Sequence, residues 1–326
     1  MPDVASSGLP APVADPPPVT ERLIEPPAVG PLLGRAVGRG LTGLTRGRSA
    51  TPLSSQRVLP SRRVEVSEQT VDIEQWAQYA RVCGMSVGTV LPGTFLHVMS
   101  FGAQMSVMGA PDFPFPMVGM VHIHNEMQML APVGPQDRLT VSAWADSVRP
   151  HRHGATVDLH ACAQTGSDVA WWGRSTYLVR GVALREGAVG SAEEPASPAR
   201  RLDAEEEVDV ATLAPWAQWS LPADVGRRYA SASGDVNPIH LHPLAARALG
   251  FPRTIVHGMW THARVLAALQ GRLPVRHAVA VSFRKPVLLP STVAFRARRT
   301  AEGYRFAVTG RDGERNHLVG SVAALA

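Results

Sequence analysis

The sequence predicts an α+β protein of two tandem domains, each a pair of helices followed by antiparallel strands. The main observation is an internal repeat, because residues 76–84 reappear in diverged form at residues 226–234. An apolar helical run that begins at a glycine follows each copy, and segments rich in β-branched and aromatic residues come after it. Such residues favour strands. At 326 residues the chain is long enough for two ordinary domains.

Residues 1–60 are rich in proline, glycine and arginine, a composition typical of a disordered or extended segment, with room for one short helix. Between residues 30 and 64 there is no acidic residue, but there are seven arginines: Arg35, Arg39, Arg46, Arg48, Arg57, Arg62 and Arg63. The whole chain has a net charge of only +5, so the positive charge is concentrated here. Residues 38–43 match G-x-G-x-x-G. No strand precedes them and no βαβ pattern follows, so a dinucleotide site is not expected.

Residues 61–185 are predicted to form the first domain. Its first helix lies at residues 76–84, and a second, apolar helix starts near Gly93 and includes the apolar run at residues 95–108. Strands are expected in three later segments: residues 139–141, 155–163 and 169–179.

A stretch at residues 186–205, rich in alanine, glycine, glutamate, serine and proline, is predicted to link the two domains. The second domain then covers residues 206–326. Its first helix lies at residues 226–234 and its long apolar helix at residues 259–269. Strands are expected at residues 278–283, 292–298, 304–309 and 317–323.

The residues that indicate chemistry lie in the second domain. Asp235 and His240 are five residues apart across an Asn-Pro turn, in which Asn237 supports the loop and Pro238 fixes its own φ. Such a turn can direct a carboxylate and a neutral imidazole at one bound water, which they could deprotonate near neutral pH. Gly258 lies where the apolar helix begins, so its backbone amide could stabilise an enolate oxygen.

Around these residues the sequence resembles the hydratase 2 motif of the MaoC-like dehydratases, the (R)-specific enoyl-thioester hydratases of the hot-dog fold. The family pattern runs from a tyrosine to Ser/Gly-Gly-Asp-x-Asn-Pro-Ile-His, then Gly-Phe, then Ile-x-His-Gly-Met. This chain has those elements at residues 229–240, 250–251 and 255–259. The resemblance implies a double hot-dog fold, with each antiparallel sheet wrapped around one long helix.

The resemblance also implies reversible syn addition of water to a trans-2-enoyl thioester of coenzyme A or an acyl carrier protein, giving an (R)-3-hydroxyacyl thioester. By the same resemblance, Asp235 and His240 hold and activate the water, and the Gly258 amide holds the thioester oxygen. The supporting residues are Asn237, Ser233 and Tyr229. His257 is expected to be structural, and no cofactor or metal is implied.

The first domain lacks this chemistry, because residues 84–90 contain neither aspartate nor histidine. One active site per chain is therefore expected. In the family, a degenerate half of this kind supplies the acyl tunnel and a dimer-like partner surface, for which residues 95–108 and 112–117 are candidates. Ordinary core packing explains those residues at least as well. We expect either a pseudo-dimeric monomer or a homodimer.

Several alternatives remain open. A hot-dog thioesterase, or a non-catalytic acyl-binding or assembly subunit, would use the same fold. His122 and His124 are expected on one face of a strand, and His151 and His153 in a turn, but neither pair has an evident third metal ligand. The arginine-rich segment could contact the phosphates of coenzyme A or an acidic carrier protein. We favour a solvated arm for it.

The rest of the chain indicates a cytoplasmic enzyme. Cys83 and Cys162 form no disulfide framework and no metal-ligand pattern, which suits a reducing compartment. The N-terminus lacks the basic and apolar regions of a signal peptide, and no apolar run is long enough to span a membrane. No nucleic-acid partner is predicted.

Overall fold

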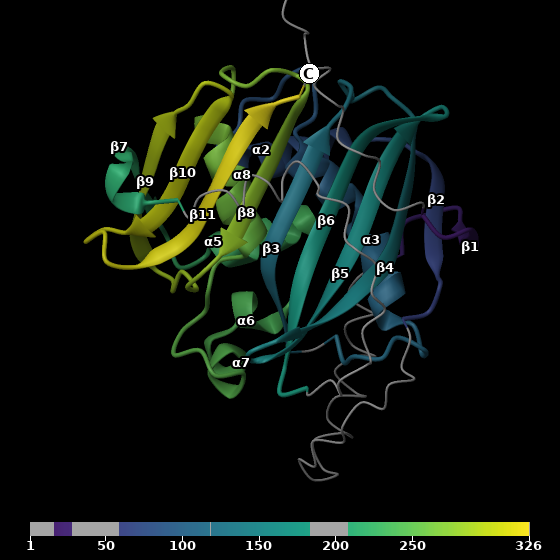
Figure 1. Ribbon diagram of the computed structural model, residues 1–326, viewed down its shortest axis with the longest axis horizontal. Coiled ribbons are helices and arrows are strands. Elements are labelled where there is room, and N and C mark those ends of the chain that lie inside the picture. Colours follow the sequence, from purple (N-terminus) through teal and green to yellow (C-terminus); the bar gives the residue numbers. More distant parts are fainter. Residues whose placement is uncertain (1–15, 28–58, 118, 183–207, 326) are drawn as a thin grey trace, which may run out of the picture.

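The computed structural model describes residues 16–27, 59–117, 119–182 and 208–325. Their strands form one 11-stranded sheet in the order β1-β2-β4-β5-β6-β3-β8-β11-β10-β9-β7 (Figure 1). The first-half strands are β1 (Val19–Leu23), β2 (Arg63–Gln69), β3 (Met120–Met129), β4 (Leu139–His151), β5 (Gly154–Thr165) and β6 (Asp168–Arg180). The second-half strands are β7 (Ala214–Leu221), β8 (His277–Phe283), β9 (Ser291–Arg299), β10 (Gly303–Gly310) and β11 (Asn316–Ala324).

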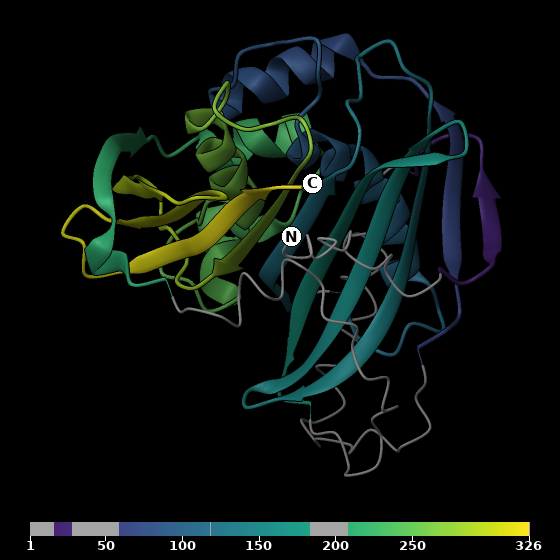
Figure 2. The same ribbon diagram turned by 45° about the horizontal axis from the view of Figure 1, so that its top comes forward.

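The helices lie behind the sheet in the view of Figure 1, and Figure 2 shows the sheet curving around them. The first half contributes α2 (Ile73–Cys83) and α3 (Gly93–Gly109). The second half contributes η1 (Val210–Thr212), α5 (Val225–Ser233), α6 (Pro238–Leu241), α7 (Pro243–Ala248) and α8 (Gly258–Ala268). None of the helices in these ranges is long and apolar enough to cross a membrane.

The two halves meet along the antiparallel pair of β3 and β8, so two smaller sheets are continuous with each other. The other ladders are also antiparallel, except that β1 pairs with β2 in parallel. This arrangement is the predicted α+β class. The strands predicted at residues 155–163 and 169–179, and the four predicted in the second half, are all confirmed.

The internal repeat is visible in the hydrogen bonds. Helices α2 and α5 each end at a glycine in the left-handed region, Gly84 with φ 69° and Gly234 with φ 76°, a conformation that costs glycine little. The helices pack together, and the rings of Tyr79 and Tyr229 lie 5.8 Å apart. Just before α3 and α8, equivalent amides make equivalent bonds: Leu91 N to Val133 O at 2.8 Å and Val256 N to Val287 O at 3.0 Å.

Helix α3 forms much of the first-half core, because most of its side chains are buried beneath β4 and β5. Phe113 and Phe115, from the second apolar candidate segment, are also buried and make an edge-to-face contact at 6.0 Å. Both apolar segments therefore contribute side chains to the core. Aromatic pairs of this kind contribute about 1 kcal/mol beyond the area they bury.

The structure differs from the sequence expectations before each helix pair, where a strand, β2 or β7, was not predicted. Residues 19–23, in the segment expected to be disordered or extended, form the extended strand β1. The G-x-G-x-x-G match, five of the seven arginines and the linker at residues 186–205 lie outside the described residues.

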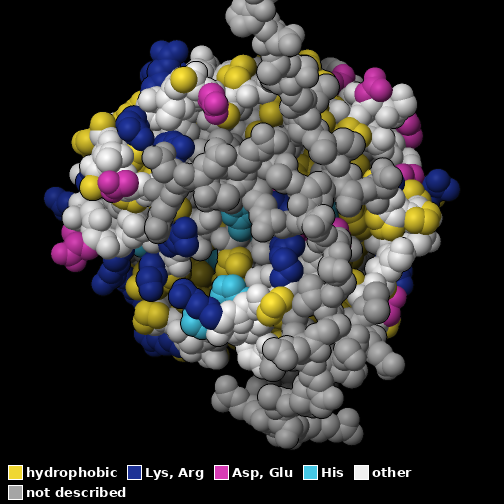
Figure 3. Space-filling model, in the orientation of Figure 1, with side chains coloured by type: hydrophobic (Ala, Val, Ile, Leu, Met, Phe, Trp, Pro, Cys, Tyr) yellow, Lys and Arg dark blue, Asp and Glu magenta, His cyan; other side chains and the backbone are white. Residues whose placement is uncertain are grey.

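Basic side chains also gather on the second half of the sheet. Figure 3 shows arginine and lysine side chains at the left of the face in view, where Figure 1 places β7, β9 and β10. The second-half strands contribute several arginines, including Arg296, Arg298, Arg299 and Arg305.

Candidate active site

The loop between α5 and α6 is held by its own short polar side chains. The Asp235 amide donates to Ser233 Oγ at 3.2 Å, and the Asn237 amide donates to Asp235 Oδ1 at 3.2 Å. Asn237 Oδ1 in turn accepts from the Ile239 amide at 3.3 Å and so caps α6, with Pro238 at its first position. These are the Asx-type turns expected of Asp-x-Asn-Pro. They fix the directions of Asp235 and His240.

His240 is held as a neutral base. Its Nδ1 donates to the carbonyl oxygen of Ile255 at 2.8 Å, which leaves Nε2 with a lone pair. Burial is the main cause that lowers the pKa of His240, neighbouring His257 adds to it, and Asp235 acts in the opposite direction; the net pKa is about 3. The ring is therefore unprotonated at neutral pH.

Asp235 lies beside this ring. One carboxylate oxygen of Asp235, one ring nitrogen of His240 and one of His257 lie within 4.8 Å of one another. Burial raises the pKa of Asp235, and the charge of His240 and the Asn237 amide partly offset the increase. The side chain is still 31% exposed, so the carboxyl can exchange protons with solvent or substrate. A water molecule between Asp235 and His240 would contact one acid and one base.

His257 completes the cluster from the start of α8. Its ring stacks on that of His240, with centroids 3.6 Å apart. Its Nε2 donates to the Asp235 carbonyl oxygen at 3.0 Å, and Tyr229 packs against its other side at 4.8 Å. The expected supporting residues Ser233, Asn237 and Tyr229 therefore all contact the catalytic loop or its neighbours.

Gly258 is the first residue of α8, as the sequence predicts. Its N–H has no acceptor within the helix, and no backbone carbonyl of the described residues accepts from it. A Cβ built on Gly258 would lie 3.0 Å from two ring carbons of Phe283. Glycine is needed here because of this close approach, and it leaves the amide accessible to a substrate oxygen.

Asp235, His240 and His257 also form a possible metal-ligand set. The two imidazole planes are only 25° apart and stacked. Ring nitrogens bind metals in the ring plane, so stacked rings present their lone pairs side by side instead of converging at about 2.1 Å. Acid–base chemistry suits this geometry better than a metal centre.

Among the described residues, neither of the other histidine pairs belongs to a cluster of three or more metal-ligating side chains. The expectation that His122 and His124 project from one strand face is wrong, because β3 has a register shift between them. His122 pairs with Tyr177 and stacks on it at 4.7 Å, whereas His124 pairs with Thr176 and contacts Ser282 Oγ. Alternate residues face opposite sides of a sheet. His151 and His153 do lie at the turn between β4 and β5.

Side chains that the sequence did not indicate lie next to the site, one from the first half and two from the second. Burial and the nearby charge of Asp235 both raise the pKa of Tyr177 on β6. Phe283 on β8, which touches Gly258, also packs against His122 at 4.9 Å. One helical turn after Gly258, His262 is fully buried with both ring nitrogens unpartnered. Strand pairing brings Tyr177 and Phe283 to the site, so no local motif could have revealed these two residues.

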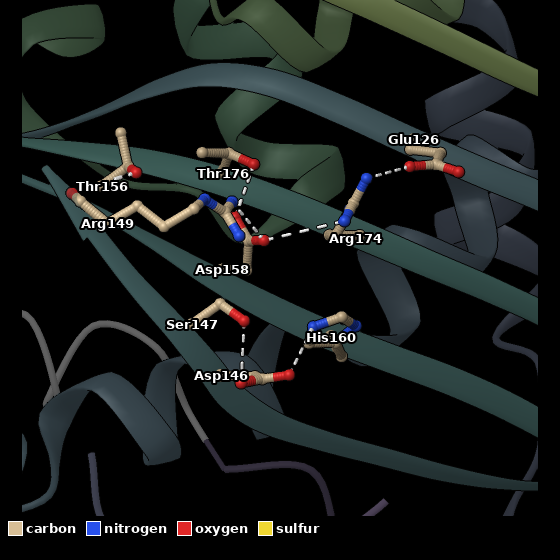
Figure 4. Close-up of polar contacts among 9 residues, drawn as sticks. All are labelled: Glu126, Asp146, Ser147, Arg149, Thr156, Asp158, His160, Arg174 and Thr176. Atoms are coloured by element: carbon tan, nitrogen blue, oxygen red, sulfur yellow. Dashed lines mark hydrogen bonds and ion pairs between the residues drawn. The ribbon is translucent and has the colours of Figure 1, made fainter. Parts of the chain in front are cut away.

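A second charged cluster lies on the opposite face of the first-half sheet (Figure 4). Buried Glu126 accepts from Arg174 at 2.7 Å, and buried Asp158 accepts from Arg149 at 2.6 Å. Thr176 Oγ1 donates to Asp158 Oδ1 at 2.7 Å. Because both carboxylates have charged partners, their burial does not by itself indicate reactivity.

Comparison with known proteins agrees with this fold and motif. The MaoC like domain model matches residues 194–317. The chain is 34% identical over 267 residues to the 3-hydroxyacyl-thioester dehydratase X of Mycobacterium tuberculosis, covering 82% of this chain and 91% of that protein. The crystal structure of HtdX from M. tuberculosis superposes with a TM-score of 0.69 at 32% identity, over 81% of this chain and all (100%) of that one.

A MaoC-like dehydratase from Phytophthora capsici has a TM-score of 0.68 at 17% identity, over 84% of this chain and 98% of that one, and shows the shared fold. The predicted double hot-dog fold is therefore confirmed. Because a relative more than 30% identical is matched over most of both chains, this chain belongs to the MaoC-like dehydratase family.

Proposed function

We propose that this chain is a hydro-lyase that interconverts trans-2-enoyl thioesters and (R)-3-hydroxyacyl thioesters in fatty-acid or related acyl metabolism. The observation that supports this proposal most is that three groups occur at one place: the buried neutral imidazole of His240, the carboxyl group of Asp235 and the unpaired N-terminal amide of α8 at Gly258. The name of the M. tuberculosis relative, a 3-hydroxyacyl-thioester dehydratase, supports the same chemistry.

The geometry suggests how each group acts. In hydration, the water oxygen bonds to C3 of the enoyl group, while the Asp235 and His240 pair takes one proton and delivers one to C2. Negative charge passes to the thioester oxygen, which the Gly258 amide stabilises as an oxyanion hole does. In dehydration the same groups remove the C2 proton and protonate the leaving hydroxyl.

The environments of the two acid–base groups suit this exchange. His240 keeps Nε2 unprotonated because Ile255 fixes the proton on Nδ1 and burial lowers the pKa. Asp235 has a raised pKa, so it gives up a proton less readily than a solvated carboxyl. Pairs of titratable groups with different environments are typical of acid–base active sites.

A single assay separates this function from its two alternatives. The purified chain is incubated with crotonyl-CoA, and enoyl absorbance and free thiol are followed together. We expect enoyl absorbance to fall with no thiol released. Equal release of thiol would indicate a thioesterase instead, and tight binding of the thioester without either change would indicate a non-catalytic acyl-binding subunit.

Stereochemistry, carrier and assembly are finer parts of the proposal. We infer an (R)-3-hydroxy product, tested by chiral analysis of the hydration product, and either coenzyme A or an acyl carrier protein as carrier. The two-domain organisation proposed from the sequence leaves a pseudo-dimeric monomer or a homodimer, which sedimentation distinguishes. A reducing cytoplasm suits the two free, buried cysteines, Cys83 and Cys162.

A further inference from the structure

A pocket of about 290 Å³ lies where the C-terminal end of α2 meets the first turns of α5, at the opposite end of α5 from the catalytic loop. Three guanidinium groups line it, those of Arg81, Arg228 and Arg264, together with the rings of Trp219 and Trp260. The acid–base site does not use this pocket, so its positive charge needs a separate explanation.

The internal repeat shows what is unusual about the pocket. Because Tyr79 corresponds to Tyr229, Gln78 corresponds to Arg228 and Ser231 corresponds to Arg81. At the catalytic end of the helix pair, Gln78 Nε2 donates to Ser231 Oγ at 3.0 Å. At the pocket end, two cations replace this neutral pair. Like charges that face each other destabilise a structure unless an anion lies between them.

The third cation is fixed in place. Arg264 donates from one nitrogen to the carbonyl oxygens of Cys83 and Gly84, both at 3.2 Å, and its guanidinium lies 5.0 Å over the Trp219 ring. These contacts satisfy the last carbonyls of α2, which would otherwise repel an anion. They also leave its other nitrogen atoms free to donate.

The surrounding carboxylates do not balance this charge. Within the part of the chain that the structure describes, the three arginines have one ion pair, between Arg228 and Asp224 at 3.6 Å, and both of its side chains are about half exposed. An exposed pair of this kind contributes little. The pocket therefore keeps an excess of about two positive charges.

We propose that this pocket binds a phosphate group. Planar guanidinium groups match phosphate oxygens in a bidentate manner, and several arginines together select a multiply charged anion. The volume suits a phosphate or phosphomonoester, being at the small end of ligand pockets. The group could come from free phosphate or, if the proposed function holds, from the coenzyme A portion of the substrate.

The repeat itself supplies the test variant, because Arg81→Ser with Arg228→Gln rebuilds the neutral pair found at the catalytic end. At constant ionic strength, millimolar phosphate replacing chloride should raise the Tm of the unaltered protein by several degrees. The double variant should lose this rise and should be the more stable protein in chloride. Arg299→Gln, an exposed arginine on β9, is the matched control and should keep the phosphate response.

The proposal would be overturned if phosphate did not raise the Tm of the unaltered protein, or if phosphate still raised the Tm of the double variant.

Kinetic measurements then show whether the bound phosphate group is free phosphate or part of coenzyme A. If the coenzyme A phosphates bind here, the double variant should have a KM for crotonyl-CoA raised about tenfold or more, with an unchanged KM for crotonyl-pantetheine. Unchanged KM values with a lost Tm response indicate free phosphate. Failure of the proposed function is distinct, because neither thioester would then be hydrated by the unaltered protein.

Discussion

The imidazole rings of His240 and His257 stack with centroids 3.6 Å apart, and both rings are almost completely buried. Each ring donates one N–H to a backbone carbonyl, from His240 to Ile255 and from His257 to Asp235. The stack therefore joins the catalytic loop to the start of α8. From the sequence His257 is expected to be structural, and from these contacts we propose more specifically that it positions His240 and Asp235.

His257→Phe tests this positioning role. The substitution keeps an aromatic ring against His240 but removes the hydrogen bond to Asp235 and the neighbour that lowers the pKa of His240. We expect kcat to fall about tenfold with little change in KM, and the acid limb of the pH profile to move to higher pH. His153→Phe, in the exposed β4–β5 turn, is the control. A purely structural residue would reduce stability and leave the pH profile where it was.

Gly258→Ala should reduce activity because the added methyl group meets Phe283 at 3.0 Å and crowds the α8 amide. Alanine keeps the backbone N–H, but its methyl group obstructs the approach of the substrate oxygen to that N–H, and an oxyanion donor that cannot be reached costs about a hundredfold in kcat. The double variant Gly258→Ala with Phe283→Leu relieves the contact. If the amide is the catalytic group, this second change should restore stability but not activity. Full recovery of kcat would show that the loss of activity came only from the contact between the added methyl group and Phe283.

Acid should destabilise the protein before most carboxylates titrate. Burial lowers the pKa of His240 to about 3 and of His257, His97 and His124 to about 4, whereas unfolded histidine titrates near 6.5. Between about pH 6.5 and 4 the unfolded chain binds protons that the folded chain does not, so unfolding becomes easier as pH falls. Asp235, with its raised pKa, acts in the opposite direction but is a single group.

Urea unfolding at several pH values measures this effect. Each such histidine adds a slope of up to about 1.4 kcal/mol per pH unit to the free energy of unfolding. A free energy that stays constant from pH 7 to pH 4.5 would contradict the assignment of buried neutral rings. The buffers should contain no phosphate and should have constant ionic strength, because phosphate bound in the proposed pocket would also change the stability.

His262→Leu should stabilise the protein. Both ring nitrogens of His262 are buried without a partner, and an unsatisfied buried polar group costs about 1–3 kcal/mol. Leucine fills a similar space without that cost. His317→Leu is the contrast, because His317 Nδ1 bonds the Lys285 carbonyl at 3.0 Å and its loss should destabilise. A destabilised His262→Leu variant would mean that the ring has a partner, such as a bound water, in solution.

Much of the fold could be predicted because the two halves carry the same signals. These signals are the Tyr79 and Tyr229 segments, the glycines that end each helix, and the Pro-Val pairs before later strands. Each signal consists of residues that are close together in the sequence. Strand β2 was missed although its Arg-Val-Glu-Val alternation is a strand signal, whereas β7 lacks such a signal. Strand β7 is an edge strand that contains a proline and exposes most of its residues, so it has little apolar alternation to detect.

The residues of the candidate site also include some that could be predicted from the sequence and some that could not. Asp235, Asn237 and His240 could be read from the sequence because their geometry comes from a local turn. The neighbours Tyr177 and Phe283 could not, because they lie on β6 and β8 and reach the site only through the pairing of these strands with β3. The bulge that separates His122 from His124 likewise depends on strand register, which no single segment specifies.

The most direct test is the rate of crotonyl-CoA hydration by the unaltered chain and by Asp235→Asn and His240→Gln. Both substitutions keep the size of the side chain, so both proteins should fold, as circular dichroism would verify. The account predicts that kcat/KM falls by about a hundredfold or more in each variant, because each loses one positioned acid or base. Near-normal kcat/KM in both folded variants would contradict it.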